Sequence, residues 1–144
     1  MGPVKLGMSP SEVSEALAPL PGALERHASR GETDYFFNNA LQVEYGADGK
    51  VHFIGASFHP GCGCTFSLMG RDPWRMAAQE LFAFLAELDG GDHQFTATEY
   101  LFPRIIVTLW EADLDYDHLG GQSRPVFAEV GVGNAAYLEA IRDL

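Results

Sequence analysis

Three potential metal ligands lie close together in the middle of the chain. His59, Cys62 and Cys64 fall within six residues, and a Cys-x-Cys turn with a nearby histidine can bind zinc or copper. A tetrahedral site normally needs a fourth ligand, and the sequence has no second cysteine-rich segment to supply one. Gly61, Gly63 and the neighbouring proline also fit a flexible connection, which is the interpretation that we favour over a metal site.

Three aspartates alternate in the second half of the chain. In an extended segment, Asp113, Asp115 and Asp117 would project their carboxylates to one side. The pattern is not that of a calcium loop, because His118 stands where the turn glycine belongs. A solvated acidic edge is the simpler interpretation, but acids with aromatic neighbours also suit a basic protein partner. Our candidate partner-binding residues are Trp110, Asp113, Asp115, Tyr116 and Asp117.

Motifs of known catalytic sites are missing from the sequence. It has no nucleophile elbow, phosphate loop or zinc-protease helix, and its five histidines have no serine or cysteine partner at a motif spacing. Only assembly through the fold could build a catalytic site. We therefore expect a protein that is not an enzyme and has no cofactor.

The aromatic content of 12% is high enough to supply both a core and an interface. We expect most aromatic residues to be in the core. Trp74 stands between Arg71 and Arg75 near the start of an expected helix, so we predict that its side chain is exposed.

The net charge of −11 is unevenly distributed. Residues 1–70 carry seven acids against four bases, and residues 71–144 carry thirteen against five. This charge keeps a protein soluble, repels nucleic acids and anionic membranes, and favours basic protein partners. No stretch approaches the ~20 apolar residues of a membrane span, and the start does not resemble a signal peptide. The two closely spaced cysteines fit a reducing compartment, so we expect a cytoplasmic location.

The elements that must position these residues begin with a short helix. Ser9, Pro10 and Glu12 form a capping-box pattern, and an apolar stripe follows until Pro21. After a short helical turn over 23–28 and a loop over 29–33, we predict antiparallel strands at 35–37, 40–45 and 51–54. Within the second of these strands, Gln42 and Glu44 alternate with apolar residues, which predicts one buried face and one solvated face.

A similar series follows in the second half. Asp72 and Pro73 predict the start of a longer helix, which ends at Asp89 before two glycines. Strands at 99–102, 105–110 and 126–130 come next, and Asn134 is the expected cap of a last helix over 135–144.

The two series indicate an internal repeat. The pattern Gly-x-(Ser/Asp)-Pro at Gly7 recurs 63 positions later at Gly70, and the strand pair that begins at Asp34 recurs 65 positions later at Glu99. We therefore predict one domain, 1–144, with repeat unit one at about 5–58, a linker at about 59–69 and repeat unit two at about 70–144. Its fold class would be α+β, with helices packed on one face of an antiparallel sheet.

The first unit carries a family resemblance. It resembles the helix-plus-sheet repeat of the β-lactamase inhibitor protein family and of the small outer-membrane assembly lipoproteins. The matching residues are Gly7, Met8, Ser9, Glu12, Val13, the run Asp34-Tyr35-Phe36-Phe37, the run Leu41-Gln42-Val43-Glu44-Tyr45 and Asp48-Gly49-Lys50-Val51. The resemblance implies a binding or scaffolding module, since the inhibitor grips its partner with the concave face of its sheet. The chain lacks the inhibitor's repeat disulfides.

These observations predict a non-enzymatic cytoplasmic protein-binding module, an inhibitor or an immunity-like neutraliser. Its partner would be another protein of basic character, and not a nucleic acid or a membrane. The alternative is a small-ligand or metal-binding module that uses His59, Cys62 and Cys64. Pairing of two copies through the solvated face of the sheet would make a homodimer, and the sequence does not decide between this and a different partner.

Overall fold

The computed structural model describes residues 3–20, 22–23, 28–30, 32–37, 39–57, 67–96, 99–110, 114–116 and 124–142. Its helices are α1 (Pro10–Leu17), α2 (Ala78–Asp89) and α3 (Ala135–Arg142). Its strands are β1 (Ala28–Arg30), β2 (Thr33–Phe36), β3 (Leu41–Tyr45), β4 (Val51–Ser57), β5 (Gln94–Thr96), β6 (Glu99–Phe102), β7 (Val107–Trp110), β8 (Leu114–Tyr116), β9 (Arg124–Val126) and β10 (Glu129–Gly133).

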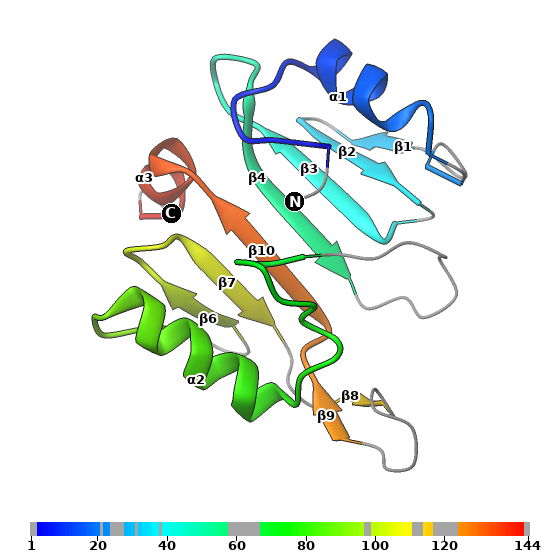
Figure 1. Ribbon diagram of the computed structural model, residues 1–144. Coiled ribbons are helices and arrows are strands. Elements are labelled where there is room, and N and C mark those ends of the chain that lie inside the picture. Colours follow the sequence, from blue (N-terminus) through cyan, green and yellow to red (C-terminus); the bar gives the residue numbers. More distant parts are fainter. Residues whose placement is uncertain are drawn as a thin grey trace.

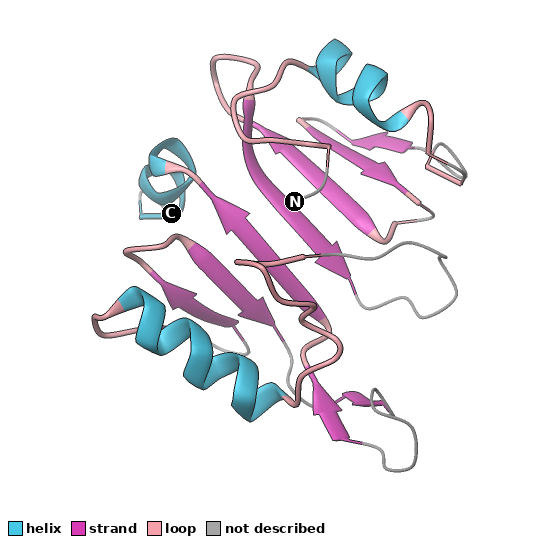
Figure 2. Ribbon diagram, in the orientation of Figure 1, coloured by secondary structure: helices cyan, strands magenta, loops and turns pink. Residues whose placement is uncertain are grey.

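Eight of the strands form one antiparallel sheet in the order β1-β2-β3-β4-β10-β7-β6-β5. At its centre β4 pairs with β10, so the first half of the chain builds one side of the sheet and the second half builds the other (Figure 1). The remaining strands, β8 and β9, pair as a separate two-stranded sheet. Figure 2 shows the helices beside the eight-stranded sheet, and the predicted α+β class is confirmed.

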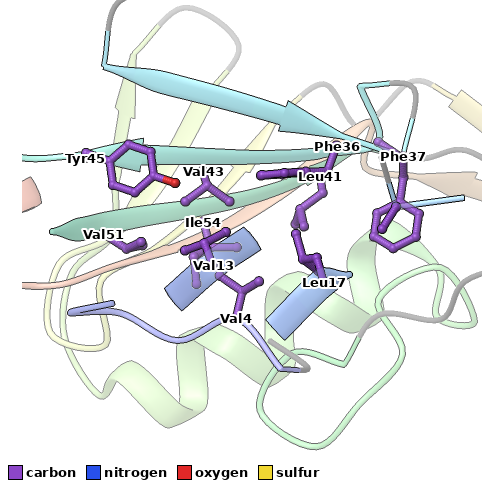
Figure 3. Close-up of a cluster of buried hydrophobic side chains, with 12 residues drawn as sticks. Val4, Val13, Leu17, Phe36, Phe37, Leu41, Val43, Tyr45, Val51 and Ile54 are labelled. Carbon is purple, nitrogen blue, oxygen red and sulfur yellow. The ribbon is translucent and has the colours of Figure 1, made fainter. Parts of the chain in front are cut away.

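One face of the sheet, which we call the core face, carries two apolar clusters. Val13 and Leu17 of α1 pack with Val43 of β3 and Ile54 of β4 in the first cluster (Figure 3). The second cluster joins apolar residues of α2, β6, β7 and β10 with Ala56 of β4. Ile54 and Ala56 are two residues apart on one strand and so point to the same face, where the two clusters meet. β-branched and aromatic side chains dominate these strand positions, as expected for a half-buried pleated surface.

Helix α1 begins as the sequence predicts. The Ser9 hydroxyl accepts a hydrogen bond from the Glu12 backbone N–H at 3.2 Å, and the Glu12 carboxylate accepts one from the Ser9 N–H at 3.1 Å. The predicted cap of α3 is also confirmed, since Asn134 Oδ1 accepts a hydrogen bond from the Tyr137 N–H at 3.2 Å. Both caps are local in sequence, which is why the pattern alone reveals them.

The predicted start of the second helix is wrong. Asp72 accepts a hydrogen bond from the Trp74 N–H at 3.0 Å within a turn, and α2 begins at Ala78. The predicted exposure of Trp74 is wrong as well, because its side chain is only 8% exposed. Its indole N–H donates to the Phe127 carbonyl at 3.0 Å, across 53 positions of sequence. A contact of this kind leaves no periodic signal near Trp74.

The sequence patterns missed the edge strands β1 and β5 and both strands of the small sheet, and the predicted strand at 126–130 covers only the end of β9 and the start of β10. β1 and β5 have three residues each, and among the described strands each has one partner, β2 and β6 respectively. Three residues are too few to show an alternating period, so the predicted loop at 29–33 includes part of β1. In the described part of the chain, no helix has the length and apolar character needed to cross a membrane.

Candidate functional site

The face of the sheet opposite the core face, which we call the second face, carries the candidate site. Its residues alternate along the strands with those of the two clusters. They are Tyr35, Gln42, Glu44, Phe53, Gly55, Leu101, Glu99, Thr108, Trp110, Glu129 and Gly131.

Two glycines shape the middle of the second face. Gly55 of β4 and Gly131 of β10 are register partners at the centre of the sheet. A Cβ atom at Gly55 would lie 2.8 Å from Glu129 Oε1, and one at Gly131 would meet the ring of Phe53. The missing side chains therefore let the Phe53 ring and the Glu129 carboxylate lie across the central strands.

Tyr137 of α3 packs on the Phe53 ring. Its ring stacks on Phe53 with centroids 4.5 Å apart and an interplanar angle of 24°. His52 meets the same ring edge-on at 5.6 Å and 74°. Gly133 makes room for the ring, because a Cβ atom there would lie 2.9 Å from Tyr137 Cγ. The Tyr137 side chain is 8% exposed, so α3 packs this residue against the second face.

Three glutamates act on the Tyr137 hydroxyl. Burial raises the pKa of Tyr137, and the charges of Glu99, Glu44 and Glu129 raise it further. The hydroxyl is therefore protonated throughout the neutral range. Burial also raises the pKa of Glu99 above 4.5, with a further contribution from the charge of Glu44.

The charge of Glu44 contributes to the raised pKa of Glu99, although the two residues belong to β3 and β6, which β4, β10 and β7 separate.

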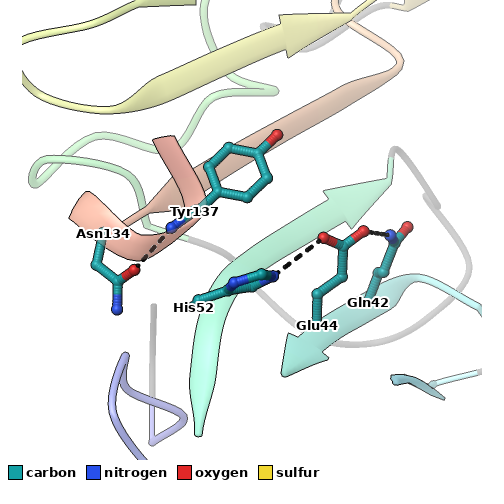
Figure 4. A network of polar contacts seen from close by, with 5 residues as sticks. All are labelled: Gln42, Glu44, His52, Asn134 and Tyr137. Carbon is teal, nitrogen blue, oxygen red and sulfur yellow. Dashed lines mark hydrogen bonds and ion pairs between the residues drawn. The ribbon is translucent and has the colours of Figure 1, made fainter. Parts of the chain in front are cut away.

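Glu44 is held by its own neighbours (Figure 4). Gln42 Nε2 donates to Glu44 Oε1 at 2.8 Å, and His52 Nε2 lies 3.7 Å from Glu44 Oε2. His52 is the additional residue of the bulge that shifts the register between β3 and β4. The bulge places His52 and Phe53 next to one another on the second face, which a regular strand would not do.

Trp110 of β7 belongs to the same face. It is the register partner of Glu129 on β10 and of Glu99 on β6, and 41% of its side chain is exposed. The structure thus places one of the predicted partner-binding residues between two of the three glutamates. The sequence patterns do not mark Glu44, Glu99, Glu129 or Tyr137 as site residues. For Glu44, the sequence signal was the alternation of Gln42 and Glu44 with apolar residues, which predicts a solvated face for the strand that is β3 in the structure.

The other predicted site residues are not brought into this arrangement. Asp115 and Tyr116 belong to β8, in the two-stranded sheet, and their side chains lie outside the described residues. Asp113 and Asp117 also lie outside the described residues, as do His59, Cys62 and Cys64. The metal-binding alternative therefore stays a prediction.

A small apolar cavity lies away from the second face. Its volume is about 250 Å³, and Ala78, Gln79, Phe82, Tyr100 and Phe127 line it. This is below the ~300–1,000 Å³ of typical small-molecule sites. None of these lining residues is charged, in contrast to the second face.

Comparison of the chain with protein-family models, with curated proteins and with solved structures found no match.

Proposed function

We propose that this protein is a non-enzymatic binding module that grips a basic protein partner with the second face of its sheet. The exposed indole of Trp110 between Glu99 and Glu129 is the observation that carries the proposal. Tryptophan is enriched among the residues that dominate interface energetics. The surrounding carboxylates supply a charge that attracts a basic surface and repels phosphate backbones and anionic lipids.

A repeat architecture is part of the same proposal. We propose two pseudo-repeated units whose helices α1 and α2 pack on the core face, as in the inhibitor family that the first unit resembles. The sheet order supports this, since β1-β2-β3-β4 and β5-β6-β7-β10 meet symmetrically at the β4–β10 pair. Gly7 and Gly70, the two copies of the repeat signal, also share a left-handed backbone, with φ of 88° and 81°. An inhibitor or neutraliser uses such a rigid sheet to present its contact residues.

The chemistry of the face fits binding better than catalysis. Tyr137 is held protonated, and the raised pKa of Glu99 is a consequence of burial and of a like charge. We place the protein in the cytoplasm in this proposal, because the closely spaced Cys62 and Cys64 suit a reducing compartment.

Capture from an extract of the source cells tests the proposal. The immobilised baits are the wild type, Trp110→Ala on the second face and Glu87→Gln, a matched control on the exposed side of α2. We expect a basic protein that the wild type and Glu87→Gln retain and that Trp110→Ala loses. Reconstitution with that purified protein should reproduce the difference by calorimetry. Equal retention by all three baits would contradict binding through this face.

A further inference from the structure

The Tyr137 side chain brings a hydroxyl group to the second face. The side chain is more than nine-tenths buried, at 8% exposure, and no hydrogen bond to the hydroxyl is found within the described part of the chain. Its ring is fixed by the stack on Phe53 and by the edge of His52. The hydroxyl is therefore held in one place, close enough to three glutamates for each to influence it.

Glu99 adds an uncompensated charge to the same place. It is half-buried, and among the described side chains none forms an ion pair or a hydrogen bond with its carboxylate. A carboxylate in this position loses part of its hydration without gaining a counter-charge. The charge of Glu44 on β3 acts on Glu99, and Glu129 on β10 lies across Trp110 from it in the register of the sheet. A cation placed here would offset both the desolvation and the mutual repulsion.

The spacing of these groups favours a broad cation. In the described residues, no three histidine, cysteine or acidic side chains are close enough to hold a metal ion. A guanidinium group is planar, carries five N–H donors and reaches separate carboxylates, and it also stacks on aromatic rings. The exposed indole of Trp110 offers such a ring between Glu99 and Glu129.

We infer that the second face takes an arginine side chain of the partner protein, with its guanidinium between the Tyr137 hydroxyl and the carboxylates of Glu44, Glu99 and Glu129, beside Trp110. This inference rests on the proposed function. The hydroxyl accepts a hydrogen bond from the guanidinium, and Glu99 supplies the counter-charge. A second copy of this chain is a poorer occupant, because facing copies would bring glutamates against glutamates at a net charge of −11 each.

Nuclear magnetic resonance with small probes tests the arginine site directly. The probes are N-acetyl-arginine amide, its neutral isostere N-acetyl-citrulline amide, and N-acetyl-lysine amide. The reporter is the indole N–H resonance of Trp110 in ¹⁵N-labelled protein. The buried indole N–H of Trp74, which donates a hydrogen bond to the Phe127 carbonyl, is the internal reference for intact folding. We expect a saturable shift of Trp110 with the arginine probe, a weaker response to lysine and none to citrulline.

Two variants connect the response to the named groups. Glu99→Gln removes the counter-charge, and Tyr137→Phe removes the hydroxyl while keeping the ring on Phe53. Each should weaken arginine binding about tenfold, which is the lower end of the loss expected for one hydrogen bond to a charged group. Glu87→Gln should leave the affinity unchanged. The Trp74 resonance shows that each variant is folded.

Several outcomes would overturn the inference. One is no response to the arginine probe, or an equal response to the citrulline or lysine probe. Another is an unchanged affinity in both variants. A Trp110 shift that follows protein concentration alone would identify a second copy as the occupant. The proposed function fails separately, when Trp110→Ala retains every protein that the wild type retains. A partner captured through Trp110 but indifferent to Glu99→Gln would overturn the arginine site and leave the function intact.

Discussion

Tyr137 of α3 stacks on Phe53 of β4, and this contact of 4.5 Å joins the last helix of the chain to the first half of the sheet. The stack depends on the absence of side chains at Gly131 and Gly133, which lie beneath the two rings. It fixes the position of the Tyr137 hydroxyl among the glutamates. The aromatic stack is therefore the support of the candidate site.

Gly131→Ala tests this support. A Cβ atom would meet the Phe53 ring and lie 2.7 Å from Thr108 Oγ1, so we expect a loss of about 1–3 kcal/mol in the free energy of unfolding, as for an overpacked core. Urea denaturation measures the loss. In a Phe53→Ala background the clash with the ring is gone, and the same glycine substitution should cost much less. An equal cost in both backgrounds would show that the ring is not what the glycine accommodates.

The two tryptophans should respond differently to the same substitution. Trp74→Phe leaves the Phe127 carbonyl without its buried donor, and we expect it to cost about 1–3 kcal/mol of unfolding free energy. Trp110→Phe, at an exposed position, should change stability by only about 0.5 kcal/mol. Chemical denaturation of the two variants gives the comparison. Similar losses for both would contradict the burial of Trp74.

Asp89 has a structural role that the sequence pattern did not show. Its Oδ1 accepts hydrogen bonds from the backbone N–H groups of Arg104 at 2.8 Å and Ile105 at 2.9 Å, which ties the end of α2 to the turn between β6 and β7. Asp89→Ala should cost about 3 kcal/mol, because two charge-assisted bonds are lost. Asp89→Asn keeps an acceptor oxygen and should cost clearly less. Thermal unfolding of both variants decides, and equal destabilisation would rule out this role.

Glu99 should make stability depend on pH. Its pKa in the folded protein is raised above 4.5, by burial and then by Glu44, so folding favours the protonated form. Its contribution to stability is complete below pH 4.5 and is lost as the pH rises through the folded pKa. The free energy of unfolding of Glu99→Gln should therefore exceed that of the wild type at pH 7, with little difference below pH 4.5. Glu87→Gln provides the control. A Glu99→Gln gain that is the same at both pH values would show that ionisation is not its cause.

The protein should be a monomer if the second face is reserved for a different protein. Light scattering at two concentrations should return the mass of one chain both times, since like charges oppose pairing through this face. A dimer at both concentrations that Trp110→Ala dissociates would instead assign the face to a second copy.

The sequence by itself determined the features that depend on near neighbours. The caps at Ser9 and Asn134 are bonds across three residues, and the α+β class follows from alternating strands between amphipathic helices. The sequence did not predict the edge strands β1 and β5, because three residues are too few to show an alternating period. In the same way, Asp72 began a turn instead of α2, since a cap pattern fixes a local bond and not the number of turns that follow.

Only the tertiary structure decided the candidate site. The buried Trp74 indole donates to a carbonyl 53 residues away. Glu44 comes from β3, Glu99 from β6 and Tyr137 from α3, and their influence on one another depends on the fold. No local pattern connects these three residues, because their proximity is set by the β4–β10 pairing and by a bulge that turns His52 and Phe53 to one face. Strand order and register depend on the packing of the whole chain, and they determine which charges meet.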